Sequence, residues 1–221
     1  MRDRLVMTLA VSAGAVDAVS WLGLGKVFSA FMTGNLVFAG LAAGGADGPS
    51  VVRVLAALLA FALGAALAAR IVRTPEPDGE WPAGVTSALR VTLALQVVFL
   101  VLWAAVGGRP SAGFGALLIA VSSVAMGVQT IAVFKLGLRA EFTTAATATL
   151  AVLAGDLAGW SASRAERLRL LTVVLGIVAG AALGALLVAH ARSWAPVLPL
   201  ALLGSVVAVA PTAQVTGWAS Q

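Results

Sequence analysis

The chain has 221 residues, of which 61% are hydrophobic and only 10% are charged, whereas a soluble domain carries about 25% charged residues. Together with a mean hydropathy of +1.03, this composition excludes a water-soluble protein and indicates a single integral membrane domain over residues 1–221. The lack of cysteine and the single His190 exclude disulfides, cysteine nucleophiles and paired-histidine metal sites, and the scattered net charge of +5 favours lipid-facing loops over nucleic-acid binding.

Eight apolar segments are candidates for membrane-spanning helices, since a span needs roughly 20 mostly apolar residues. They cover residues 5–24, 30–46, 51–72, 85–107, 112–134, 144–160, 168–190 and 195–211. Three of them are short, so seven spans with one re-entrant segment is the alternative. The apolar runs are too long for barrel strands and do not alternate. The sequence therefore predicts an all-α, polytopic transmembrane helix bundle.

The segment 73–84, RTPEPDGEWPAG, is rich in proline and acidic residues and predicts an exposed loop near the middle of the chain. Tryptophans lie near the ends of the predicted spans, where aromatic belts form at the membrane surface. They are Trp21, Trp81, Trp103, Trp160, Trp194 and Trp218. Their positions support the layout of the spans.

The two halves of the chain resemble each other at an offset of 114 residues. Leu22-Gly23-Leu24 aligns with Leu136-Gly137-Leu138, and Phe28-Ser29 aligns with Phe142-Thr143. We therefore predict a duplication, with one repeat over about 5–107 and a second over about 112–217. Because each repeat would hold four spans, an even number, the two would share one orientation and form parallel repeats.

Small residues recur every four positions in the third and seventh predicted spans, a spacing that lets helix backbones approach closely. The glycines in these rows are Gly64, Gly176, Gly180 and Gly184. They predict tight helix packing, either between the two repeats or across the face of a homodimer.

Asp17 lies well inside the first predicted span, where an ionisable side chain is costly and faces a bundle interior or a cavity. Ser20, three residues further on, shares its helix face. Gln129 and Thr130 fall near the corresponding place in the second repeat. These side chains predict a polar site between the repeats, where Asp17 would pair with a charge or carry a proton. The alternative is a structural hydrogen bond from Asp17 to neighbouring backbone or to Asn35.

Thr33, Gly34 and Asn35 interrupt the apolar second span, although an unsatisfied polar group in hydrocarbon costs several kcal/mol. One interpretation is that Thr33 caps a helix starting at Gly34, whose free N–H groups would attract a substrate's anionic or carbonyl group. Thr147 lies at the matching place in the second repeat. The alternative is that the threonines bond carbonyls of their own helices and that Asn35 bonds a neighbouring helix.

The stretch 13–42, AGAVDAVSWLGLGKVFSAFMTGNLVFAGLA, resembles the signature of the YoaK-type family of bacterial membrane proteins. A second, weaker block is Met126-Gly127-Val128-Gln129, followed by Thr143-Thr144. Where members carry a Thr-Gly-Thr-like element, this chain has Thr147-Ala148-Thr149. The resemblance implies an uncharacterised multi-pass protein of the bacterial cytoplasmic (inner) membrane, a kind sometimes described as a permease.

The leading hypothesis is a small-molecule transporter or permease with its site between two repeats, where Asp17 would be a charge partner for the substrate or a proton carrier. A channel, or a membrane scaffold without transport activity, is the alternative. Nothing in the sequence forms a nucleophile–base–orienting set, so we expect no enzyme, no metal site and no cofactor. A transporter predicts a cavity reaching Asp17 from one side, and a scaffold predicts Asp17 and Asn35 fully satisfied by protein.

Overall fold

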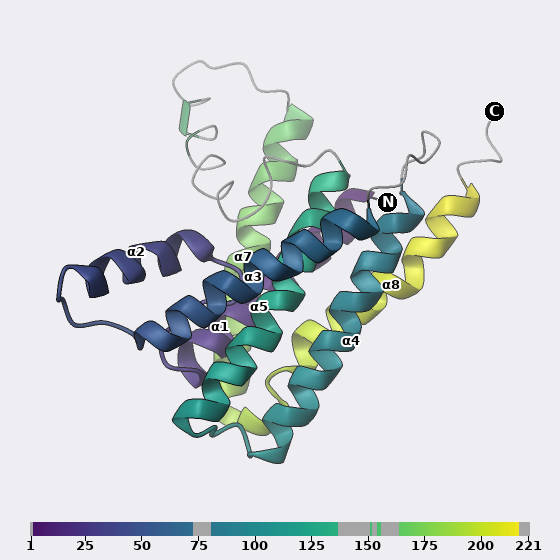
Figure 1. Cartoon of the computed structure of the whole chain (residues 1–221). Helices are drawn as coiled ribbons and strands as arrows, with labels where there is room; N and C mark the ends of the chain where they lie inside the picture. The colour runs from purple at the N-terminus through teal and green to yellow at the C-terminus, as the bar shows by residue number, and fades with distance from the viewer. Residues whose placement is uncertain (1, 73–80, 137–150, 152–153, 156–163, 217–221) are drawn as a thin grey trace.

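A computed structural model describes residues 2–72, 81–136, 151, 154, 155 and 164–216, and the described elements are all helices (Figure 1). The α-helices are α1 (Arg2–Gly23), α2 (Met32–Ala43), α3 (Val51–Ile71), α4 (Ala83–Ala105), α5 (Ala112–Lys135), α7 (Arg164–His190) and α8 (Val197–Thr216), and a 3₁₀ turn η1 (Arg192–Trp194) precedes the last of them. The predicted all-α class is confirmed.

Six helices within the described residues are long and apolar enough to cross a membrane: α1, α3, α4, α5, α7 and α8. The predicted total of eight spans is not confirmed. The second predicted span is the 12-residue helix α2, which at 1.5 Å per residue is about 18 Å long, against a hydrocarbon core of about 30 Å. The sixth predicted span, 144–160, lies largely outside the described residues.

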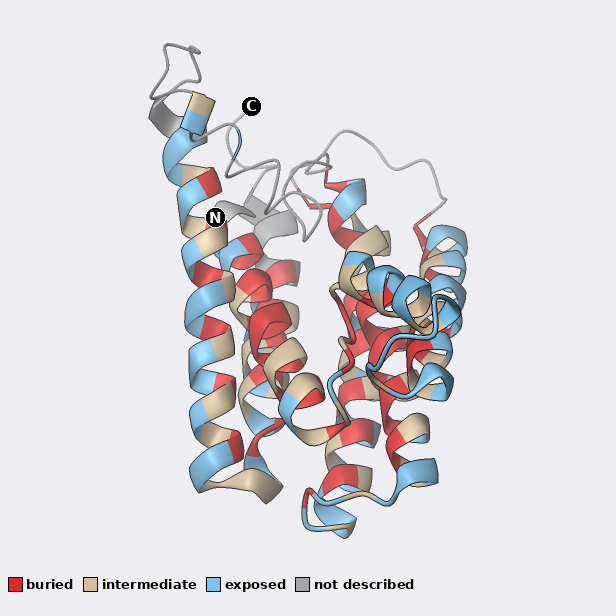
Figure 2. Ribbon diagram, turned by 90° about the vertical axis from the view of Figure 1, so that its left-hand side faces the viewer, coloured by how far each residue is buried: buried red, intermediate tan, exposed pale blue. Residues whose placement is uncertain are grey.

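The two central helices are α1 and α5. In each of them 61% of the residues in the most apolar stretch are buried inside the protein, whereas the share is 22% for α3 and 28% for α7. Figure 2 shows buried residues gathered on the inward helix faces and exposed residues on the outside. The outward faces of α3 and α7 carry large apolar side chains such as Leu59, Leu63 and Val178. Such a continuous apolar exterior fits contact with lipid rather than with water.

Helix α7 packs against α1 through its row of glycines. A Cβ added to Gly180 would collide with the backbone of Val11, and one added to Gly184 would lie 2.9 Å from the carbonyl oxygen of Ala15. At Gly176 an added Cβ would only reach ordinary contact, 3.4 Å from the Val11 side chain. The closest approach of the two backbones therefore centres on Gly180, as expected for a small-residue seam.

Helix α3 packs against α5 in the same manner. A Cβ added to Gly64 of α3 would collide with the backbone of Val124, and one added to Gly127 of α5 would collide with the backbone of Phe61. Gly14 of α1 likewise lies directly against the backbone of α7. Glycines on both helices of each pair thus allow the close contacts of α1 with α7 and of α3 with α5. The contact with α7 fixes the position of α1, which carries Asp17.

Candidate functional site

The chain turns back on itself after α1, through Gly25 and Lys26, both of which have positive φ angles (90° and 64°). It then runs back along α1 until the backbone of Ser29 to Phe31 lies beside Asp17. Asp17 is six residues before the end of α1, about 9 Å along the helix. Helix α2 therefore starts well inside the depth spanned by α1, and Figure 1 shows it extending outward from the side of the bundle.

Asp17 holds this returning segment by its backbone. Its Oδ1 accepts hydrogen bonds from the N–H groups of Ser29 (2.9 Å) and Ala30 (2.8 Å), and its Oδ2 accepts one from Phe31 (3.1 Å). These N–H groups directly precede α2, where they would otherwise be unsatisfied in an apolar surrounding. A carboxylate is the favoured partner at a helix start because the helix dipole is positive there.

Ser20 and Asn35 bind the same segment. The Ser20 and Ser29 hydroxyls lie 2.6 Å apart, and both side chains are fully buried. The Asn35 amide donates to the carbonyl of Phe28 (2.7 Å), and its oxygen accepts from the N–H of Phe28 (3.1 Å). Three of the polar residues singled out in the sequence therefore converge on one stretch of backbone.

Thr33 is not the cap expected from the sequence. Helix α2 begins at Met32 rather than Gly34, no side chain of its N-cap residue closes it, and Thr33 is exposed. Gly34 instead leaves room for aromatic rings, since an added Cβ would lie 2.7 Å from the ring of Phe31 and 3.0 Å from that of Phe28.

A groove of about 540 Å³ opens beside Asp17, between α1, α7 and the returning segment. This volume lies within the range of about 300–1,000 Å³ typical of small-molecule sites. Asp17 is half-buried and, among the described residues, is the only charged one in the lining. The groove is lined by Ala13, Gly14, Asp17, Ala18, Trp21, Leu22, Phe28, Phe31, Ile177, Ala181 and Ala185.

One wall of this groove is aromatic. The rings of Trp21 and Phe28 stack with centroids 4.8 Å apart, and Phe31 meets Phe28 edge-on at 5.3 Å. Phe38 of α2 backs the stack, 6.1 Å from Phe28. The opposite wall, from α7, is formed by Ile177, Ala181 and Ala185 and offers only apolar side chains.

Gln129 and Thr130 are not part of the groove lining. The Thr130 hydroxyl donates to the carbonyl of Met126 in its own helix (2.8 Å). Gln129 is fully buried, and neither polar atom of its amide has a hydrogen-bond partner among the described residues. The structure thus separates these two residues from Asp17, with which the sequence had grouped them. Thr147 lies outside the described residues.

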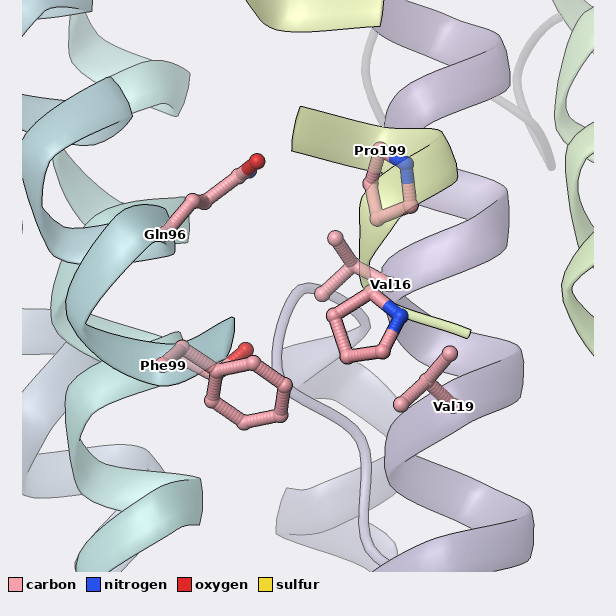
Figure 3. A pocket seen from close by; sticks show the side chains of 7 residues that line it. Val16, Val19, Gln96, Phe99 and Pro199 are labelled. Carbon is pink, nitrogen blue, oxygen red and sulfur yellow. The ribbon is translucent and has the colours of Figure 1, made fainter. Parts of the chain in front are cut away.

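A second buried amide, Gln96 of α4, also lacks partners for both polar atoms. Figure 3 shows it pointing across a gap toward Pro199 of α8 and Val16 of α1. The cavity there, which Ser122 also lines, has a volume of about 10 Å³, room for about one water molecule. In this conformation the centre of the bundle is too tight for a small-molecule ligand.

Sequence reasoning missed the aromatic wall. Trp21 lies near a span end and so fits the membrane-surface belt, whereas Phe31 falls inside the predicted span 30–46 and Phe28 just precedes it. A usable signal was present, since Asp17 and Trp21 are four residues apart and so share a helix face. An acid and an indole on one face of an intramembrane helix are unusual enough to mark a site.

These features define a multi-pass α-helical membrane protein in which irregular backbone at membrane depth borders a groove. The chain belongs to a family of proteins of unknown function, DUF1275, which matches residues 5–209. It is similar to the UPF0700 transmembrane protein YoaK of Bacillus subtilis (strain 168), with 38% identity over 158 residues, or 72% of this chain and 68% of that protein. The resemblance carried by residues 13–42 is therefore confirmed. No solved structure matches the chain.

Proposed function

We propose that the protein is a transporter of small molecules in the bacterial cytoplasmic membrane, and that the groove beside Asp17 is its binding site. The observation that carries this proposal is the groove itself: it is large enough for a metabolite and places a half-buried carboxylate beside a helix that starts inside the membrane. Discontinuous helices of this kind form the substrate sites of many secondary transporters. The Bacillus relative supports the bacterial location.

The proposal includes two parallel repeats. Gly14 and Gly127 are 113 residues apart, and Gly64 and Gly180 are 116 apart. The first helix of each half packs on the third predicted span of the other half, α1 on α7 and α5 on α3, and each contact holds one member of each glycine pair. This reciprocity supports a pseudo-twofold relation, which puts the groove between α1 of one repeat and α7 of the other. Rocking of one repeat against the other would then open the groove to alternate sides.

A scaffold without transport activity is the second candidate, and one observation favours it. Asp17, Ser20 and Asn35 all bind protein groups, as a purely structural role requires. A channel has less support, because the cavity at Gln96, between α1, α4, α5 and α8, holds about one water. Transport and scaffolding therefore differ in what the groove binds, rather than in how the polar residues are bonded.

The test is a thermal-unfolding screen of the purified protein against cationic, neutral and anionic metabolites, followed by flux of each stabilising compound into proteoliposomes. A ligand of the native state raises the melting temperature by mass action. Ala181→Leu, which fills the groove, should abolish both effects, whereas Ala182→Leu on the exposed side of α7 should not. If no compound stabilises the protein or crosses the membrane, the scaffold candidate replaces the transporter.

A further inference from the structure

We infer that the groove beside Asp17 takes an organic cation, meaning a protonated or quaternary amine, or a related onium ion, that carries apolar substituents. This inference rests on the proposed function, because it names the class of substrate for the same site. It is argued from the charge of the groove, from its aromatic wall and from the chemistry of its remaining walls.

The first argument is charge. Acidic side chains inside membrane proteins usually pair with a cation or a polar partner, yet within the described part of the chain no lysine or arginine forms an ion pair with Asp17. Its hydrogen-bond donors are three neutral backbone N–H groups. Oδ2 accepts only one of these bonds, from Phe31, and a carboxylate oxygen can accept two. Asp17 therefore has an acceptor position and a negative charge available to a ligand in the groove.

The second argument is the aromatic wall. Trp21, Phe28 and Phe31 line the same groove as Asp17, and cations bind the faces of aromatic rings, with tryptophan the strongest of the three. The Nζ atom of Lys26 lies 5.3 Å from the centroid of Trp21, within the range of a cation–π contact, so a cationic ligand on this ring would take the place of the lysine. Aromatic rings grouped around an acid are the arrangement by which proteins bind alkylated ammonium groups.

The third argument concerns the other walls. The α1 and α7 sides offer alanine, glycine, isoleucine and leucine, which suit apolar substituents and give an anion no donor. Two arginines, Arg109 and Arg192, line a neighbouring pocket that shares Leu22 and Ala185 with the groove. An anionic ligand would use that pocket instead, so the sign of the ligand's charge decides between the two places.

The experiment compares tetraphenylphosphonium with tetraphenylborate, which share a shape and differ in the sign of their charge. Binding to the full-length protein in nanodiscs is measured by calorimetry, with empty nanodiscs subtracted for partition into lipid. We expect the phosphonium to bind and the borate to bind at least about tenfold more weakly. Asp17→Asn should weaken phosphonium binding by about tenfold or more, while Asp47→Asn, in an exposed loop, should leave it unchanged.

Because Asp17 also holds α2, a second variant keeps the test independent of folding. Trp21→Leu removes the ring and leaves every hydrogen bond of Asp17 in place, and it should weaken the phosphonium about 2- to 30-fold. Trp194→Leu, at an exposed tryptophan outside the groove, is the matched control. Borate binding as strong as phosphonium binding and weakened equally by Trp21→Leu, or wild-type phosphonium affinity in both folded groove variants, would overturn the inference.

The two proposals fail in different ways. Phosphonium binding that depends on Asp17 and Trp21, without flux in proteoliposomes, supports the cation site and refutes transport of that cation. Flux of a neutral or anionic metabolite that Ala181→Leu abolishes, with no phosphonium binding, supports transport and refutes the cation site.

Discussion

Asn35→Ala tests whether the polar residues of α2 stabilise the fold. The wild-type amide makes two hydrogen bonds to the backbone of Phe28, at 2.7 and 3.1 Å, and is fully buried. The substitution removes both bonds and leaves one backbone N–H and one carbonyl without a partner inside the membrane. The variant should therefore be less stable, and α2 should be less firmly attached to α1.

The size of the effect can be bracketed. Hydrogen bonds between membrane helices average about 0.6 kcal/mol each, so two give a lower limit of about 1.2 kcal/mol. Leaving two buried polar groups unpaired costs about 1–3 kcal/mol apiece, and because Phe28 is itself only half-buried, we take the lower half of that range. The expected loss is then about 1–4 kcal/mol, or roughly 3–12 °C in melting temperature for a chain of this size.

The assay is thermal unfolding in nanodiscs, followed by circular dichroism, with Thr33→Ala as the matched control. Thr33 lies two residues before Asn35 on the same helix and is exposed, so its truncation should change the melting temperature by less than about 2 °C. If Asn35→Ala melts within that margin of the wild type, the bidentate contact contributes no stability and the structural reading of Asn35 is wrong.

Three further predictions concern packing and polar satisfaction, each read out as a change in melting temperature. Gly64→Leu should lower the free energy of unfolding by about 1–3 kcal/mol or more, because the added side chain meets backbone in α5. Gly40→Leu, at a position with open space around it, should be tolerated. Equal effects of the two substitutions would contradict close packing of α3 on α5. Ser20→Ala should lower the free energy of unfolding by about 1 kcal/mol. Adding Ser29→Ala should restore part of this stability, since removing both partners of a buried hydrogen bond costs less than removing one. If the losses of the two substitutions simply add, the two hydroxyls do not form a hydrogen bond. Gln96→Met should be neutral or stabilising by about 1–2 kcal/mol because no described protein group bonds its buried amide, and a clear destabilisation would mean that a water in the adjoining cavity bonds the amide.

The long helices could be predicted from hydropathy alone because their length is set by the thickness of the bilayer. The predicted 85–107 became Ala83–Ala105, and the predicted 112–134 became Ala112–Lys135. Helix α2 was harder to predict, because residues 30–46 are as apolar as a true span. Its start is fixed by Asp17, 12 to 14 residues away from the N–H groups that it binds. No local periodicity carries that information.

The candidate site was only partly predictable for a similar reason. A polar side chain in an apolar run is conspicuous in a sequence, so Asp17, Ser20 and Asn35 could be singled out. What each of them binds depends on the turn at Gly25 and Lys26, whose backbone angles bring residues 28–31 back along α1. The alignment of the two halves places Gln129 near the position of Asp17, whereas Gln129 is not among the residues that line the groove.

The two roles assigned to Asp17 are compatible because they use different properties of the carboxylate. Holding α2 requires acceptor atoms aimed at three N–H groups, and neutral amides leave the net charge of the carboxylate in place. Binding a cation requires that charge and one further acceptor position. An asparagine, which has a single acceptor oxygen, could bind only part of this set of N–H groups. The carboxylate is therefore suited to the start of α2, and the cation that we propose for the groove would use the charge and the acceptor position that the N–H groups leave.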